Sequence, residues 1–329
     1  MNSHSNHTAT HEITNSCSYN KIIFIVAFGI TALYFLHPFV SVVNRESFID
    51  IVEFRKKKSA SPLQRTLGFI RWNKPYREHI PLMEKYQSFF AQLHYSLPNY
   101  TTNLDYKIDG FAHENTPYYA VSEVMKIILQ RYPSIEGLLY FHFDTWIRPF
   151  RFDDIDYKKI WFPVRNNIPF LCEPSTSVRQ WDMGLLHNAQ NFSSEVIRIY
   201  IGRFVIDKTV FCRSWSDIYY IPRRFFNDFI DLSDISYTIN LFHEIAIPTM
   251  INIIDLSHRL TPFHTVIAPL SDCFGQCCSF GTGPNELVER RCGHRIDLSN
   301  ATIRKSFADV LDLENAFLKK LLSNQSTFF

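Results

Sequence analysis

The hydrophobic pattern in the middle of the chain alternates between short apolar runs and stretches with helical spacing. Residues 65–72 form the first apolar run and predict a strand, and residues 76–90 follow with apolar side chains at helical intervals. A second short strand is expected at residues 92–96. This β-α-β order predicts a parallel pair of strands joined by a right-handed crossover.

The same alternation continues in the next part of the chain. Thr116 is placed to cap a helix that starts with Pro117 and ends near residues 131–133. An apolar strand is expected at residues 138–143. Strand, helix, strand, helix, strand is typical of α/β proteins, so we expect a mixed, mostly parallel sheet flanked by helices.

The downstream pattern is less regular. Residues 216–222 predict a strand that ends at Pro222, and residues 223–232 and 242–256 have helical character. Further short elements are expected at 159–164 and 194–201, the run 205–215 is ambiguous, a segment rich in Cys and Gly covers 272–297, and an amphipathic helix covers 301–322. We assign residues 65–322 to one globular domain.

The N-terminal part differs in composition. Residues 1–20 are polar and are expected to be disordered. Residues 22–43 carry no formal charge and are long enough to cross a bilayer, although a His-Pro pair interrupts them. A signal peptide with a long leading region is the alternative, but no small-x-small cleavage site follows cleanly. We therefore favour an uncleaved transmembrane signal anchor at residues 21–43, followed by a charged stem at residues 44–64.

The signals for membrane orientation disagree. Positive charge is heavier after the anchor than before it, which by the positive-inside rule would place the C-terminal part in the cytosol. Six of the seven cysteines and four Asn-x-Ser/Thr sequons lie beyond the anchor, and both suit an oxidising lumen. These sequons are at Asn99, Asn191, Asn300 and Asn324, and another lies at Asn6. With the resemblance given below, they lead us to expect a lumenal C-terminal domain and a cytoplasmic tail at residues 1–20.

Overall composition excludes some classes of protein. The chain has 34 Lys and Arg against 32 Asp and Glu, so nothing in its charge indicates a nucleic acid partner. It has 30 Phe, 16 Tyr and only 10 Gly, which is unlike a low-complexity or fibrous protein. Its 329 residues are enough to bury a sizeable core.

One stretch joins a strand pattern to candidate chemistry. Residues 137–146 begin as an apolar and aromatic run and end in a polar cluster that contains His142 and Asp144. An acid at the C-terminal end of a buried strand lies where open α/β sheets bind ligands. The alternative is an ordinary core strand with a solvated Asp144 at its tip.

Three stretches, in this order, resemble glycosyltransferases of the GT-A type. Residues 139–149 resemble the place of the DxD motif in exostosin-like and STELLO-like Golgi transferases and in related single-pass proteins of filamentous fungi. Residues 217–225 are similar to their strand-then-helix segment beside the acceptor. Residues 243–248, His-Glu-Ile-Ala-Ile-Pro, are similar to their acidic Glu-Asp-Ile-x-Met-Asn type of motif. The resemblance covers roughly residues 67–298.

The resemblance implies a GT-A-like, Rossmann-like fold, a nucleotide-sugar donor, a glycan or glycoprotein acceptor, and a Golgi or ER location. It also implies a divalent metal, because a Lewis acid stabilises the charge that develops on the leaving diphosphate. Asp144 is kept, but His142 stands in place of the first acid. Mn²⁺ accepts imidazole more readily than Mg²⁺ does, so we expect Mn²⁺ on Asp144 and His142, with His294 as a candidate further ligand.

Both histidines have a simpler interpretation. His142 would then only hydrogen-bond a backbone carbonyl, and the enzyme would be metal-independent or inactive. His294 would then lie at the surface or bridge parts of the core.

Other residues are candidates for contacts with the two substrates. Arg71, Arg291 and Arg295 are candidates for the donor nucleotide, since guanidinium groups suit phosphate geometry. Glu244, among apolar neighbours, is our first choice for the catalytic acid-base group on the acceptor side, and Asp217 is the second. Glu244 could instead orient an acceptor hydroxyl, or simply favour a helix N-terminus. The side chains that could stack on sugar rings, or else pack in the core, are Trp146, Trp161, Trp181 and Trp215.

The cysteines of the C-terminal segment allow two interpretations. Cys273, Cys277, Cys278 and Cys292 could be zinc ligands, but their spacing is not a paired C-x2-C. In a lumenal domain disulfides are favoured. Six cysteines allow many pairings, and the sequence does not choose among them.

Two rival functional classes stay open. A catalytically inactive glycosyltransferase-like membrane scaffold is supported by the missing first acid. A receptor or adhesion ectodomain is disfavoured by the α/β pattern, and a parallel sheet would argue against it.

Overall fold

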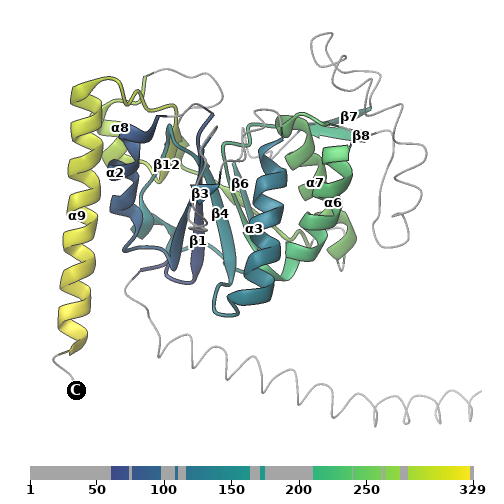
Figure 1. The fold of residues 1–329 in the computed structure, drawn as a ribbon, viewed down its shortest axis with the longest axis horizontal. Coiled ribbons are helices and arrows are strands. Elements are labelled where there is room, and N and C mark those ends of the chain that lie inside the picture. The colour runs from purple at the N-terminus through teal and green to yellow at the C-terminus, as the bar shows by residue number, and fades with distance from the viewer. Residues whose placement is uncertain are drawn as a thin grey trace, which may run out of the picture. The chain divides into compact units, whose positions relative to one another are not determined.

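The computed structural model of this protein describes residues 61–73, 76–97, 108–109, 116–163, 171–174, 210–238, 240–259, 261, 264–274 and 281–326 (Figure 1). The expected tail, the anchor and nearly all of the stem lie outside these residues, as do Asn99, Asn191 and Trp181. Within the part of the chain that the structure describes, no helix is both long and apolar enough to span a bilayer.

A seven-stranded sheet forms the centre of the domain, in the order β10-β6-β9-β4-β1-β2-β3. Its strands are β1 (Thr66–Arg71), β2 (Gln92–Ser96), β3 (Ile108–Asp109), β4 (Gly137–His142), β6 (Ile160–Pro163), β9 (Ile218–Pro222) and β10 (Ile267–Leu270). Only β9 is antiparallel to its neighbours, and the other described pairings in this sheet are parallel. The predicted α/β class with a mostly parallel sheet is confirmed.

The first β-α-β unit forms as predicted in its strands but not in its helix. β1 pairs in parallel with both β2 and β4, and Arg71 lies opposite His142 in that register. The connection contains three short turns of helix, η1 (Arg77–His79), α2 (Ile80–Met83) and η2 (Glu84–Tyr86). Pro81 is tolerated only in the first turn of an α-helix, so the α-helical part begins at Ile80 rather than at residue 76.

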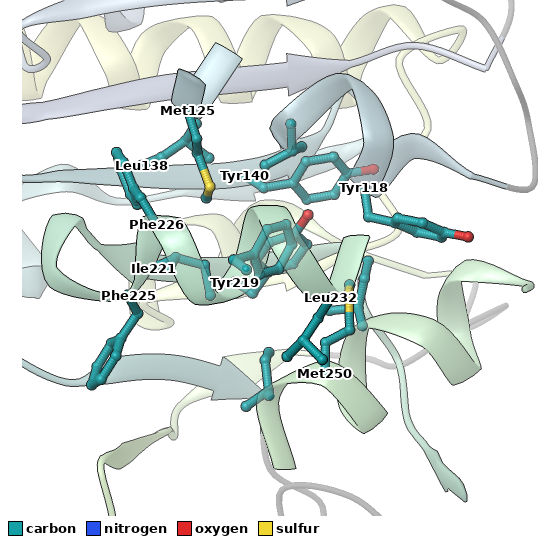
Figure 2. Close-up of a cluster of buried hydrophobic side chains, with 14 of the residues drawn as sticks. Tyr118, Met125, Leu138, Tyr140, Tyr219, Ile221, Phe225, Phe226, Leu232 and Met250 are labelled. Atoms are coloured by element: carbon teal, nitrogen blue, oxygen red, sulfur yellow. The ribbon is translucent and has the colours of Figure 1, made fainter. Parts of the chain in front are cut away.

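Three helices share one core with one face of the sheet, as Figure 2 shows. They are α3 (Pro117–Arg131), α6 (Phe226–Thr238), which follows the turn η5 (Arg223–Phe225), and α7 (His243–His258). Leu138 and Tyr140 of β4 point into this core, whereas Leu139 and Phe141 belong to the core on the other face. This alternation has the period of two that a strand buried on both faces requires. Thr116 precedes α3 as predicted, but its side chain forms no capping hydrogen bond with the helix.

The second core contains the C-terminal helix α9 (Ala301–Ser326) and a small three-stranded sheet. That sheet has the order β11-β12-β5, with β5 (Thr145–Ile147), β11 (Cys273–Phe274) and β12 (Cys292–His294). The turn η3 (Pro149–Phe152) follows β5, and α8 (Pro284–Glu289) precedes β12. Two residues separate the end of β4 from the start of β5, so the small sheet continues directly from the end of a central strand.

Two disulfides connect strands that lie side by side. Cys273 of β11 is bonded to Cys292 of β12, directly opposite in the register. Cys172 of β7 (Leu171–Pro174) is bonded to Cys212 of β8 (Val210–Arg213). The zinc interpretation is therefore wrong for Cys273 and Cys292, while the other two cysteines of that segment lie outside the described residues.

Candidate metal centre

Three chain segments meet at one edge of the central sheet. β4 ends at His142, and a turn through residues 143–144 leads into β5. Because β9 runs antiparallel to β4, the residue that precedes β9, Asp217, comes to the same edge where β4 ends. The amide nitrogen of His142 donates a hydrogen bond of 2.9 Å to the carbonyl oxygen of Asp217. The end of β12 brings His294 beside them through its pairing with β5.

His142, Asp217 and His294 form a group that can hold a metal ion. Each offers one ligand atom, and these atoms lie within 4.8 Å of one another. Both histidines are buried, whereas Asp217 is half-buried. Sequence reasoning placed His142 and His294 here but assigned Asp217 to the acceptor. Its place in this group depends on the direction of β9, which the local residue pattern does not encode.

Asp144 lies at the centre of a buried network of hydrogen bonds and ion pairs. Its Oδ1 is 2.5 Å from Nδ1 of His142 and 3.3 Å from Nε2 of His294. Its Oδ2 accepts a hydrogen bond of 2.7 Å from Nε of Arg295. Its carbonyl oxygen accepts another, of 2.8 Å, from the amide of Ile296. These bonds tie the turn after β4 to the segment after β12.

The network shifts the pKa of its members in opposite directions. Burial alone would raise the pKa of Asp144, but the charge and hydrogen bond of His142 and the hydrogen bond of His294 hold it far below its usual range. Burial alone would lower the pKa of His294, but the hydrogen bond with Asp144 and the charge of Asp217 raise it. Asp144 is thus an ionised carboxylate in the core, stabilised by its donors.

The chemistry of the group fits a divalent transition metal. Nδ1 of His294 is buried and has no hydrogen-bond partner among the described residues, and Oδ2 of Asp217 lies 3.8 Å from it. A buried polar atom left without a partner is costly, and an ion is one of the few groups that would satisfy it. Two imidazoles and one carboxylate suit Fe or Zn better than Mg or Ca, which prefer oxygen ligands.

The three arginines predicted to bind the donor have different surroundings in the structure. Arg71 is buried at the end of β1, opposite His142, and its guanidinium donates to the carbonyl oxygen of Trp72. Arg295 pairs with Asp144 and keeps a partly exposed side chain. Arg291 precedes β12, at the opposite end of that strand from His294, and its ion pair is with Asp154.

Glu244 lies in the first turn of α7, close to the segment that carries Asp217. Its carbonyl oxygen accepts a hydrogen bond of 3.1 Å from the amide of Ser214. Trp215 follows Ser214, and its ring centroid lies 5.5 Å from that of His294. Residues 214–217 therefore connect the third sequence motif to the metal-binding group.

The remaining sequence candidates in the described part of the chain are three tryptophans and two sequon asparagines. Trp146 and Trp161 are fully buried core residues, so the core-packing alternative holds for both, whereas Trp215 is half-buried beside the site. Asn300 and Asn324 are exposed. Oδ1 of Asn300 also accepts hydrogen bonds from the amides of residues 302 and 303, and so caps the start of α9.

No protein-family model matches the sequence, and no curated protein matches it either. Among solved structures, a glycosyltransferase involved in the glycosylation of the major capsid of PBCV-1 is similar with a TM-score of 0.38 and 8% sequence identity. The match covers 75% of this chain and 98% of that chain. The function proposed below rests on the sequence motifs and on the site.

Proposed function

We propose that this protein is a metal-dependent, GT-A-like glycosyltransferase that moves a sugar from a nucleotide-sugar donor to a glycan or glycoprotein acceptor. The observation that carries the proposal is that the first two family-like stretches meet where β4 ends, and that the third contacts the segment just before the second. The first stretch supplies His142 and Asp144, the second starts at Asp217, and the third supplies Glu244 beside Ser214. Ligand chemistry is expected at this edge of an α/β sheet.

In this proposal His142, Asp217 and His294 hold the metal. The metal would act as a Lewis acid on the diphosphate leaving group of the donor. Mn²⁺ is the proposed ion, because it accepts imidazole ligands such as these two more readily than Mg²⁺ does. The partly exposed guanidinium of Arg295 adds positive charge next to this group, where it can contact a phosphate oxygen.

On the acceptor side, Glu244 is the proposed general base. It lies in the first turn of α7, next to the chain segment that supplies Asp217 but in a different element from the metal group. Its side chain is half-buried, and as a carboxylate it can accept a proton from an acceptor hydroxyl group. Asp217 is assigned to the metal instead.

We further propose that residues 21–43 anchor the protein in the Golgi or ER membrane, with the C-terminal domain in the lumen. Two disulfides, Cys172–Cys212 and Cys273–Cys292, support this side of the membrane. Structural disulfides persist in oxidising compartments and are rare in the cytosol.

Incubation of the purified protein with a panel of nucleotide sugars tests the function. We expect slow release of the nucleoside diphosphate even without acceptor, loss of this hydrolysis in EDTA, and recovery with Mn²⁺ to a greater extent than with Mg²⁺. The rival proposal is an inactive membrane scaffold, and the feature that supports it is His142, which stands where the family has an acid. A protein that binds Mn²⁺ but turns over no donor in the panel would support the scaffold.

A further inference from the structure

The hydrogen-bonding capacity of Asp144 is largely used within the protein. A carboxylate offers about four lone-pair directions. Oδ1 faces Nδ1 of His142 and Nε2 of His294, and Oδ2 accepts from Nε of Arg295. Asp144 is also almost fully buried, with 3% of its surface exposed. A metal ion on this carboxylate would have to compete with donors that already compensate its charge.

The two histidines turn opposite ring nitrogens toward Asp144. His142 uses Nδ1, which leaves Nε2 as its only possible metal ligand. His294 uses Nε2, which leaves Nδ1, the atom that has no hydrogen-bond partner among the described residues and lies 3.8 Å from Asp217. A ligating imidazole normally donates its second N–H to a carboxylate, which fixes the tautomer and the ring orientation.

We infer that Asp144 is a positioning residue that holds both metal-binding imidazoles, and that Asp217 is the carboxylate that ligates the metal. This inference rests on the metal centre of the proposed function. One buried carboxylate thus fixes two ligands from distant parts of the chain, at residues 142 and 294. The acid kept from the family-like motif then acts through the histidines rather than on the ion.

The tautomers give the first test. The full chain, labelled with ¹⁵N in its histidines and loaded with Zn²⁺ as a diamagnetic probe, is measured by long-range ¹H–¹⁵N NMR, with signals assigned through single His→Gln variants. We expect His142 to carry its proton on Nδ1 and His294 on Nε2, with the opposite nitrogens bound to zinc. Any other pair of tautomers overturns the inference.

Substitutions give the second test, with Co²⁺ as a spectroscopic probe. Asp144→Asn keeps the shape and one acceptor oxygen, so we expect affinity to fall about 10–100-fold while the positions of the visible d–d bands stay unchanged. Asp217→Asn removes a ligand and should change those bands. Asp228→Asn is the matched control, because Asp228 is equally buried and is bonded to His258 away from the site. It should alter neither affinity nor spectrum.

The outcomes separate this inference from the proposed reaction. A d–d spectrum that changes in Asp144→Asn as it does in Asp217→Asn would make Asp144 a ligand and overturn the inference. If Asp144→Asn does not fold, the tautomers in the unaltered chain decide. A protein that binds the metal with the expected tautomers but transfers no sugar refutes the reaction and leaves the inference standing. A protein that binds neither Zn²⁺ nor Co²⁺ refutes both the inference and the metal dependence.

Discussion

At the residue scale, the site divides into a buried part and a more accessible part. The side chains of His142, Asp144, His294 and Asp217 are at most 15% exposed, whereas that of Arg295 is 42% exposed. Groups that hold geometry are expected in the interior, and groups that meet a diphosphate are expected at its edge. In the proposed function, a diphosphate would therefore approach the site from the side of Arg295.

Replacement of Glu244 by Gln should separate catalysis from metal binding. The side chain is isosteric but cannot take a proton, so we expect kcat to fall about 10²–10⁴-fold, the range that positioned general bases contribute. Affinity for Mn²⁺ should stay the same, because the metal group comes from other elements. Isothermal titration and initial-rate measurements on the same preparation check both results.

A matched control is Glu123→Gln, which removes a carboxylate paired with Lys126 on the surface of α3. It should change neither quantity. Unchanged transfer in Glu244→Gln would remove Glu244 from the mechanism.

At the element scale, the small sheet sets the position of His294 in the site. Gly293 lies between Cys292, which is fixed by a disulfide, and His294, and it is paired with Trp146 of β5. A Cβ atom added at Gly293 would lie 2.8 Å from three atoms of the Trp146 indole, closer than real contacts allow. The close approach of β12 to β5 therefore needs glycine at this position.

Gly293→Ala should push β12 away from β5 and move His294 relative to Asp144. Overpacking of this kind typically costs about 1–3 kcal/mol of folding free energy. We also expect weaker binding of Mn²⁺, since ligands must be held closely to the productive geometry. Thermal unfolding and Mn²⁺ titration by EPR measure the two effects.

Gly68→Ala is the appropriate comparison. Its added Cβ atom would lie 2.7 Å from the side chain of Leu93, between β1 and β2, so it should also destabilise the fold, by less where the flexible end of Leu93 moves aside. Metal affinity should be retained in that variant at temperatures where it is folded. Equal loss of Mn²⁺ affinity in both variants would mean that general destabilisation, rather than the position of β12, is responsible.

Sequence patterns predicted the large elements well because each buries a regular face. β1, β2, β4 and β9 were each located to within two residues, and α3 was expected at its observed start. β11, β12 and α8 were missed, because two to six residues are too few to show a period. The approach of Asp217 to His294 was also missed, because it depends on the direction of β9 and on the pairing of β12 with β5.

At the scale of the whole molecule, the proposed membrane anchor raises the question of the side of the membrane on which the domain lies. The two disulfides and the sequons favour the lumen, whereas the charge distribution around residues 22–43 favours the cytosol. Disulfides and glycans both form only on the lumenal side, so the modification state of the exposed sequons decides the matter. Asn300 and Asn324 are the two sequons in the described part of the chain.

Expression of the full chain in eukaryotic cells should therefore give a protein whose electrophoretic mobility increases after treatment with an N-glycosidase. Asn300→Asp should remove one glycan step without a loss of thermal stability. Asp caps a helix as well as Asn does, and its charge is favourable at the start of α9. Thr302→Ser keeps the sequon and should keep the glycan.

A variant at Asn6 should not change the mobility, because that sequon precedes the proposed anchor. A chain whose sequons beyond the anchor all stay unmodified would place the domain in the cytosol, where the two disulfides would not be maintained.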